Sequence, residues 1–374
     1  MTIPQVSLSG RLSRRAVMRL LGLGAGVRLV PAWRAELLAS PLQGSVPAGK
    51  PVAGVAKGAI IRTLLRDLSP DAIGGVTLFH EHLSIDLPPA APRPADAPPL
   101  PPPATRNVDY IVDEIRTAAK EGVGCIVDGG HADMGRDLDA LKRVANETGV
   151  HVVASGGYYM ERVYPPDIAT KSDDQIAEDL VREAGANRYG AFGEIGQMPD
   201  MADMTPSERK VFRAVGKAHV RTGLPIFTHN AYGTGPNVRP DAGLRQLDVL
   251  ESVGVKPQNV AIGHACCLDD QTAAVLKEIA RRGAFVGFDR VTGGRVPDDM
   301  KVTTILALLD AGYADKLLVC SDYTGSRSAA RPGYGNTVTV FAPLLRKAGV
   351  REDVLYSILY DAPRRFLAFV PRKA

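Results

Sequence analysis

Gly75-Val-Thr-Leu-Phe-His-Glu-His82 is the stretch from which the expected fold follows, near the start of the globular part of the chain. Val76, Leu78, His80 and His82 alternate, so a β-strand would place all four on one face. The two apolar residues would be buried, and the two imidazoles would emerge together where the strand ends. Such a pair is suited to hold a divalent metal. The pattern alone is equally typical of hydrogen-bonded core histidines, so the rest of the chain has to decide.

The composition is that of a soluble globular protein with a large core. The chain has 374 residues, of which 45% are hydrophobic and 23% are charged. A net charge of +4 is mild, and we find no basic stripe with interleaved aromatic residues, so nucleic acid is not an expected partner. None of the four cysteines has a C-x-x-C spacing, and buried thiols are the expected state of Cys125, Cys266, Cys267 and Cys320.

The N-terminal segment predicts export. Arg14 and Arg15 precede an apolar, glycine-rich run over residues 20–31, and small residues follow near position 40. The adjacent arginines resemble the twin-arginine type of signal, which implies a periplasmic or exported protein. The run is too short for a stable membrane span. Alternatives are an amphipathic anchor or a disordered basic tail. We assign residues 1–40 to the signal and residues 41–57 to a linker.

Short apolar runs alternate with helical patterns through the rest of the chain. Helices are expected over 108–121, 138–148, 207–222, 244–253 and 272–282, and many of them end at glycine. The expected strands are 76–82, 125–128, 150–155, 189–194, 225–229, 260–264, 284–288 and 317–322. Eight strand–helix units predict an α/β fold, a (β/α)8 TIM barrel over residues 58–370. A doubly wound open sheet is the alternative, but a dinucleotide or phosphate-loop fingerprint for it is missing.

Metal-binding side chains end several of these strands. The carboxyl ends of barrel strands meet at one face, so we expect six side chains to converge there: His80, His82, Glu194, His229, His264 and Asp322. These are too many for one tetrahedral zinc but suit two divalent ions. We assign His80, His82 and Asp322 to one ion, and His229 and His264 to the other, with Glu194 bridging. Zinc is the leading expectation, and manganese, cobalt or iron also fit.

Two such ions would bind and deprotonate a water at neutral pH and polarise the electrophile, while Asp322 would carry the proton to the leaving group. The remaining histidines, His131, His151 and His219, are expected to be structural, although His131 follows the second strand and could face the pocket. Residues 88–103 hold nine prolines directly after the first strand. This segment is expected to be extended and leaves the barrel at the active face, where a solvated loop is the simplest interpretation.

These residues resemble the phosphotriesterase family of the amidohydrolase superfamily. The motifs that carry the resemblance span roughly residues 58–370 and include Gly75–Leu83, Gly193-Glu194-Ile-Gly196, Pro225–His229, Phe288-Asp289 and Ser321-Asp322. The resemblance implies a binuclear metal hydrolase on a distorted barrel, usually a homodimer, and supports the ligands assigned above.

Two departures refine what the resemblance implies. Many family members bridge the metals with a carboxylated lysine, whereas Glu194 takes that place here, as in the phosphotriesterase homology branch. Organophosphate hydrolases carry an aspartate near Cys267 and a histidine at the position of Arg290. An arginine there is similar to the family's lactonases, as is a tyrosine near Tyr158 or Tyr159. An ion pair with a neighbouring acid is the competing interpretation of Arg290.

Three functions are therefore considered. The first is a metal-dependent hydrolase of lactones or other carboxylic esters, with Asp322, Arg290, Tyr158 and Tyr159 as candidate catalytic residues. The second keeps the metals but cleaves amides or phosphoesters, including phosphotriesters. The third is a barrel that binds a metal or small ligand without catalysis, which the complete ligand set disfavours.

Overall fold

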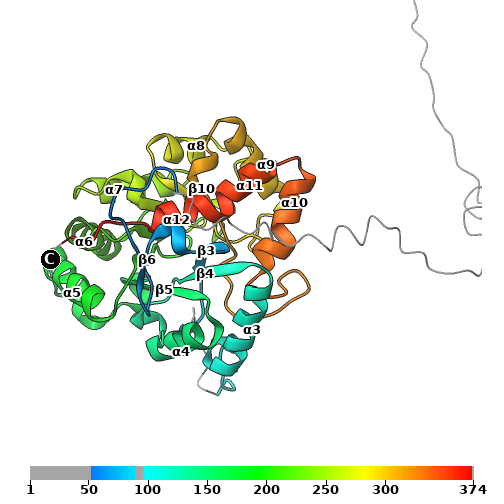
Figure 1. Ribbon diagram of the computed structural model, residues 1–374. Coiled ribbons are helices and arrows are strands. Elements are labelled where there is room, and N and C mark those ends of the chain that lie inside the picture. Colours follow the sequence, from blue (N-terminus) through cyan, green and yellow to red (C-terminus); the bar gives the residue numbers. More distant parts are fainter. Residues whose placement is uncertain (1–51, 90–93, 95, 373–374) are drawn as a thin grey trace, which may run out of the picture. The chain divides into compact units, whose positions relative to one another are not determined.

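The computed structural model describes residues 52–89, 94 and 96–372 (Figure 1). Its main sheet has eight strands: β3 (Val76–Glu81), β4 (Val123–Asp128), β5 (His151–Gly156), β6 (Ala191–Gly196), β7 (Ile226–His229), β8 (Val260–Ile262), β9 (Phe285–Phe288) and β10 (Leu317–Val319). Each strand pairs in parallel with the next one along the chain. This order confirms the predicted (β/α)8 barrel, because an open doubly wound sheet would require a reversal of strand order.

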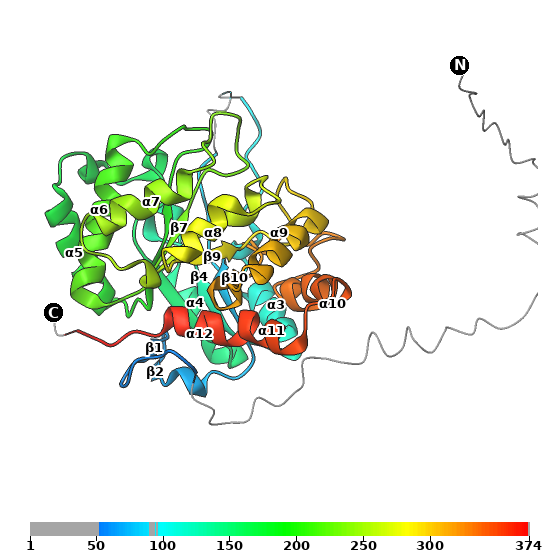
Figure 2. The same ribbon diagram turned by 90° about the horizontal axis from the view of Figure 1, so that it is seen from above.

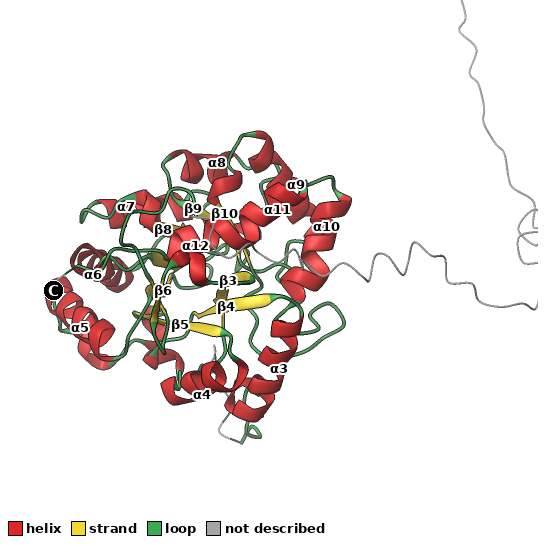
Figure 3. Cartoon of the chain, viewed as in Figure 1, coloured by secondary structure: helices red, strands yellow, loops and turns green. Residues whose placement is uncertain are grey.

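Helices surround the sheet, as Figure 3 shows with helices in red and strands in yellow. Their bounds are α3 (Val108–Lys120), α4 (Leu138–Thr148), α5 (Asp173–Ala186), α6 (Pro206–Thr222), α7 (Ala242–Glu251), α8 (Ala274–Arg281), α9 (Asp298–Asp310), α10 (Ala342–Lys347), α11 (Glu352–Tyr356) and α12 (Ala362–Leu367). Sequence signals explain where α6 begins and ends. Thr205 and Glu208 form a capping box at its start, and Gly223 ends the helix with φ 81°.

The strands are covered on both faces. All six residues of β3 are buried, including Val76 and Leu78, which are fully inaccessible to solvent. Parallel barrel strands pack against side chains inside and helices outside, so their sequences show apolar runs rather than strict alternation. A polar residue within such an apolar run is therefore the feature of the sequence that points to a functional site.

The barrel closes without a regular ladder between the described strands β3 and β10. Instead, the N–H of Asp322 donates to His80 O at 3.3 Å, and the N–H of His82 donates to Tyr323 O at 2.9 Å. The buried Glu81 carboxylate accepts from the backbone N–H of Ser321 at 3.0 Å and from that of Tyr323 at 2.6 Å. A single side chain of β3 therefore anchors the backbone that carries Asp322.

The N-terminal end of the barrel is covered by a small hairpin. Strands β1 (Ile61–Arg62) and β2 (Asp67–Leu68) pair antiparallel, and Figure 2 shows them beside α12. Ile60 forms a bridge with Phe369, and the N–H of Leu64 donates to Val152 O at 2.9 Å. This cover fixes the end of the barrel opposite to the one where the strand-terminal histidines lie.

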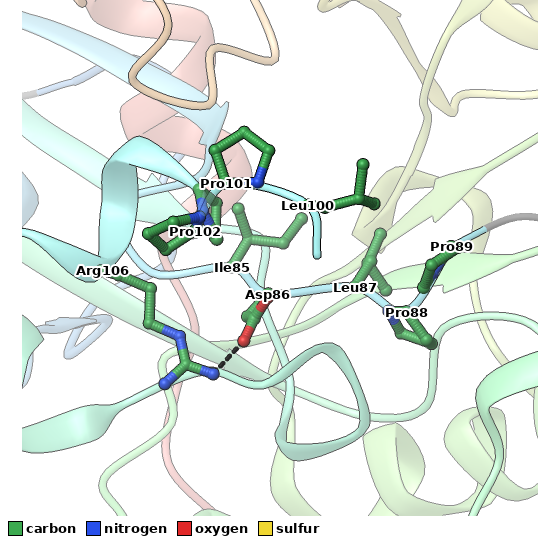
Figure 4. Close-up of a pocket in the computed structure, with 10 residues that line it drawn as sticks. Ile85, Asp86, Leu87, Pro88, Pro89, Leu100, Pro101, Pro102 and Arg106 are labelled. Carbon is green, nitrogen blue, oxygen red and sulfur yellow. Dashed lines mark hydrogen bonds and ion pairs between the residues drawn. The ribbon is translucent and has the colours of Figure 1, made fainter. Parts of the chain in front are cut away.

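The described parts of the proline-rich insertion form neither strand nor helix between residues 88 and 103. Residues from both ends of the insertion and from the segments that flank it line a hollow of about 810 Å³, and an ion pair joins Asp86 to Arg106 at its edge (Figure 4). Ile85 and Leu87 pack against the cluster of Met134, Tyr159 and Met160. The segment just before the insertion therefore contacts residues of the loop that follows β5.

Some sequence-based expectations lie outside the described residues. These are the export signal at residues 1–40 and most of the linker at residues 41–57. Among the described helices, none has the length and apolarity needed to cross a membrane. The four cysteines are buried and free, as expected.

Replacing Glu81 with Gln tests the anchor at the barrel seam. An amide would present an N–H₂ group to one of two backbone N–H donors, and one buried donor would lose its partner. We expect the free energy of unfolding to fall by about 2 kcal/mol, measured by urea denaturation of chelator-treated protein. Glu352→Gln, which alters an exposed pair with Arg346, is the control and should have little effect. Equal stability of the two variants would contradict the anchor.

Candidate metal centre

The six side chains expected to converge do meet at the carboxyl end of the barrel. His80, Glu194 and His229 lie on β3, β6 and β7, and His82, His264 and Asp322 follow the ends of β3, β8 and β10. Each of the six residues is at most 8% exposed. Residues that are up to 242 positions apart in the sequence thus form one buried polar cluster.

Glu194 lies between two pairs of imidazoles. Its Oε2 atom is 3.4 Å from His80 Nε2 and 3.4 Å from His82 Nε2. Its Oε1 atom is 3.1 Å from His264 Nε2 and 4.0 Å from His229 Nε2. Each carboxylate oxygen therefore faces a different pair of histidines, which is the arrangement needed for a ligand shared between two ions.

Asp322 lies on the side of Glu194 that faces His80 and His82. Its Oδ1 atom is 3.1 Å from His82 Nε2 and 3.8 Å from His80 Nε2. The grouping of His80, His82 and Asp322 on one side of Glu194, with His229 and His264 on the other, matches the grouping expected from the sequence.

The chemistry of this cluster fits metal ions. Among the described residues, His80 Nε2 and His264 Nε2 are buried and have no hydrogen-bond partner. The candidate ligand atoms of His80, His82 and Glu194 lie within 4.8 Å of one another, as do those of Glu194, His229 and His264. Imidazole nitrogens and carboxylate oxygens are ligands for zinc, manganese, cobalt and iron. Two divalent ions would satisfy the unpartnered nitrogens together.

Asp289, which directly follows β9, orients two of the imidazoles from outside the cluster. Its carboxylate accepts from His80 Nδ1 at 3.0 Å, from His264 Nδ1 at 2.9 Å and from the N–H of His264 at 2.7 Å. With both Nδ1 atoms donating to Asp289, the Nε2 atoms are the ones free to bind a metal. The motif Phe288-Asp289 is recognisable in the sequence, but it did not reveal this role of Asp289. Its position at a strand end was the available signal.

The ionisation of the cluster follows from burial and opposite charges. Burial alone would raise the pKa of Glu194, but the neighbouring His80 and His229 hold it well below its usual range. Burial would lower the pKa of His82, yet hydrogen bonds to carboxylates raise it to about 9. The pKa of His264 rises to about 10 against the effect of burial, chiefly through Asp289. Without metal, protons on imidazoles thus compensate the buried carboxylates.

Local backbone geometry brings the ligands close together. His264 and Asp322 adopt left-handed conformations, with φ of 54° and 48°, which few residues other than glycine adopt. Gly129, just after β4, leaves room for the imidazoles of His80 and His82. A Cβ atom at this position would lie 2.8 Å from His80 Cδ2 and 3.2 Å from His82 Cε1. Any larger residue at position 129 would displace the two imidazoles.

Arg290 lies at the edge of the cluster. Its Nε atom is 2.8 Å from Asp322 Oδ2. An ion pair was the competing interpretation of this arginine, and such a pair is present, with a predicted ligand as the acid. The terminal nitrogens of Arg290 have no hydrogen-bond partner among the described residues, and its side chain is 37% exposed. Arg290 can therefore hold Asp322 and still donate to a bound molecule.

The two candidate tyrosines lie in different places. Tyr159 is buried, and its ring centroid is 5.1 Å from that of His229. Tyr158 packs its ring against Tyr164 at 6.2 Å and lines a separate cavity. The structure therefore brings Tyr159 to the cluster and directs Tyr158 away from it. Sequence spacing could not distinguish two adjacent residues in a loop.

The other histidines are apart from the cluster. His219, on α6, has its Nδ1 atom 2.6 Å from Leu224 O, and His151 opens β5 at the opposite end of the strand from the cluster. His131 follows β4 and lines the same separate cavity as Tyr158. None of the three belongs to the group of six converging residues.

Fold and site together define a class: parallel (β/α)8 barrels with a candidate two-metal centre at the carboxyl ends of the strands. The profile of the phosphotriesterase family matches residues 62–367. The chain belongs to the phosphotriesterase family.

Relatives within the family agree with this assignment. The chain is 32% identical to the phosphotriesterase homology protein of Escherichia coli over 309 residues, which cover 78% of this chain and 97% of that protein. A crystal structure of that protein with phosphate in its active site matches with a TM-score of 0.67 at 30% identity, covering 78% of this chain and 98% of the other.

Two further relatives carry the names of different hydrolases. An aryldialkylphosphatase of Saccharolobus solfataricus is 30% identical over 314 residues, covering 79% of this chain and 95% of that protein. The N-acetyltaurine hydrolase of Bos taurus is 28% identical over 288 residues, covering 71% and 78%. Members of this family are thus hydrolases that act on different bonds.

Asp289→Asn tests the support of the metal centre. Asparagine keeps one acceptor oxygen, so one of the two imidazoles loses its partner and its fixed tautomer. We expect affinity for Zn²⁺ to fall by roughly 10- to 100-fold, measured by competition with a chromophoric chelator. Asp315→Asn, at a largely exposed position, is the matched control and should bind as the unmodified protein does. Unchanged affinity in Asp289→Asn would show that Asp289 does not support the metal centre.

Proposed function

We propose that the protein is a binuclear metal-dependent hydrolase of lactones or other carboxylic esters, which acts as an exported homodimer. The observation that carries the proposal is the Glu194 carboxylate, with one oxygen toward His80 and His82 and the other toward His229 and His264. Zinc is the leading candidate for both ions, with manganese, cobalt or iron as alternatives.

When bound, two divalent ions would supply a hydroxide nucleophile at neutral pH and polarise the electrophilic oxygen of the substrate. His80, His82 and Asp322 would hold one ion, His229 and His264 the other, and Glu194 both. The chain's own contribution is a rigid and nearly dry arrangement of these groups, each fixed at a strand end.

Asp322 is suited to accept the proton released during attack. Burial alone would raise the pKa of Asp322, but Arg290 and His82 hold it well below its usual range, so the carboxylate is ionised at neutral pH. Its two oxygens face different partners, His82 for Oδ1 and Arg290 for Oδ2. A proton received at Oδ1 can then pass to the leaving oxygen.

Arg290 and Tyr159 support an ester substrate. The unpartnered terminal nitrogens of Arg290 can donate to the oxygens of a carboxylic ester and of the carboxylate product, for which a guanidinium has matching geometry. Burial raises the pKa of Tyr159 well above its usual value, so its hydroxyl keeps its proton as a donor. Tyr158, which lines a separate cavity, has no part in this arrangement.

Cleavage of amides or phosphoesters, phosphotriesters included, is the second candidate. The same hydroxide would attack all of these bonds. Relatives named aryldialkylphosphatase and N-acetyltaurine hydrolase, and a related structure with phosphate in its active site, favour keeping both possibilities. A non-catalytic metal-binding or ligand-binding barrel is the third candidate, and the completeness of the site disfavours it.

A substrate screen with Asp322→Asn tests these possibilities. The zinc-loaded protein is assayed with lactones, aryl esters, N-acyl amides and phosphotriesters, and we expect the highest kcat/KM with a lactone or ester. Asp322→Asn should lower kcat by roughly 100- to 10,000-fold, whereas Asp310→Asn, at the end of α9, should not.

Turnover of amides or phosphotriesters alone would select the second candidate. Retained metal binding without turnover of any substrate would select the third. Arg290→Met refines the test, because it should raise KM for esters and, since Asp322 loses its ion-pair partner, lower kcat as well.

Export is tested through the paired arginines. Replacing Arg14 and Arg15 with Lys keeps the charge but removes the twin-arginine feature, so we expect the protein to remain in the cytoplasm of a bacterial host. Immunoblotting of periplasmic and cytoplasmic fractions measures the outcome. Undiminished delivery to the periplasm would contradict the proposal.

A further inference from the structure

A second cavity, separate from the metal cluster, lies between the loops after β4 and β5 and helix α5. Its volume is about 240 Å³, and the described residues that line it include His131, Asp133, Tyr158 and Glu183. None of the six converging residues is among these lining residues. At the roughly 30 Å³ that a water occupies in the liquid, the cavity holds about eight water-sized groups.

Two residues that line this cavity carry buried polar atoms without hydrogen-bond partners. His131 is 1% exposed, and neither of its ring nitrogens has a hydrogen-bond partner among the described residues. The Oδ1 atom of Asp133 likewise has no hydrogen-bond partner there and lies 3.5 Å from His131 Nδ1. The other oxygen of Asp133 accepts from the N–H of Tyr159 at 2.8 Å. Polar groups buried in this way are costly unless something in the cavity satisfies them.

The cations around the cavity are already engaged. Lys171 pairs with Asp167 at 2.5 Å and with Asp179 at 2.7 Å, and Arg182 pairs with Asp179 at 2.6 Å. Arg136 donates to backbone carbonyls and, at 3.0 Å, to the hydroxyl of Tyr189. Arg136 Nε is the exception, because it is buried and has no hydrogen-bond partner among the described residues. Little further cationic capacity is left for an anionic ligand.

The acceptors, in contrast, are in excess. The Glu183 carboxylate has no hydrogen-bond or ion-pair partner among the described residues, although it is half-buried, and burial together with Asp179 raises its pKa. Asp133 Oδ1 is the second carboxylate oxygen that accepts no hydrogen bond from the described part of the chain. The cavity thus presents unfilled acceptors from two acids, together with the phenol ring of Tyr158.

We propose that this cavity binds a small organic cation that carries a primary ammonium group. Such a group offers three donors and no acceptor, which matches Glu183, Asp133 and an unprotonated nitrogen of His131. The ring of Tyr158 provides an apolar wall for the attached carbon chain. The site is independent of the metal cluster and of the reaction proposed for it.

Binding of ethanolamine to the full-length protein tests this site by isothermal titration calorimetry. At neutral pH ethanolamine is protonated, and we expect saturable binding with Kd on the order of 1 mM, whereas ethylene glycol, its uncharged counterpart, should not bind. Glu183→Gln should weaken binding about tenfold, because it removes a charge-assisted hydrogen bond. Glu178→Gln, on the same helix but paired with Arg221 outside the cavity, is the matched control and should leave binding unchanged.

Two further measurements locate the bound amine. Binding should persist after the metals are removed with a chelator, and its loss would place the amine at the metal cluster and overturn the proposal. A crystal structure of the protein soaked in ethanolamine should show the amine beside Glu183 and Asp133. Ordered water alone in that structure, or equal affinity in Glu183→Gln and Glu178→Gln, would also overturn the proposal.

Discussion

The contact between one carboxylate and two pairs of imidazoles is the constraint on which the site depends. Glu194 Oε1 and Oε2 lie 3.1 Å and 3.4 Å from histidines on opposite sides. Six polar residues, each at most 8% exposed, would be costly to bury separately. Gathered around one carboxylate, they compensate one another's charge and leave a set of nitrogens that a pair of cations would complete. The parallel barrel makes this gathering possible, because every strand delivers its last residues to the same end.

A second layer of carboxylates fixes where those residues lie. Asp289 joins the imidazoles of His80 and His264, which come from different strands, and Glu81 holds the backbone on both sides of Asp322 across the barrel seam. Neither acid faces the centre of the cluster. Each converts a flexible strand end into a fixed one by filling the hydrogen-bonding capacity of groups that carry the ligands. The left-handed backbone at His264 and Asp322 is held in place by these contacts.

The sequence predicts the barrel and the six converging residues well, for a physical reason. Strands buried on both faces are continuous apolar runs, so a histidine or acid at the end of a run is conspicuous. The role of Asp289 was not predicted, because it depends on which two imidazoles lie on either side of it in three dimensions. The different positions of Tyr158 and Tyr159 follow from the loop after β5, where Gly157 has φ 135°. Spacing along the chain carries no information about such a turn. The irregular seam likewise depends on contacts between residues about 240 positions apart.

The cluster by itself does not select the bond that is cleaved, since relatives in this family are named for phosphoester and amide substrates. Selectivity therefore has to come from groups beside it, and here Arg290 is tied to the cluster. Its Nε atom holds Asp322, while its terminal nitrogens have no partner in the described part of the chain. In the proposed mechanism, a change at this arginine would alter both the substrate contact and the carboxylate that accepts the proton. Substrate preference and proton transfer would then be coupled through one side chain, so mutations at Arg290 and Asp322 should not be additive.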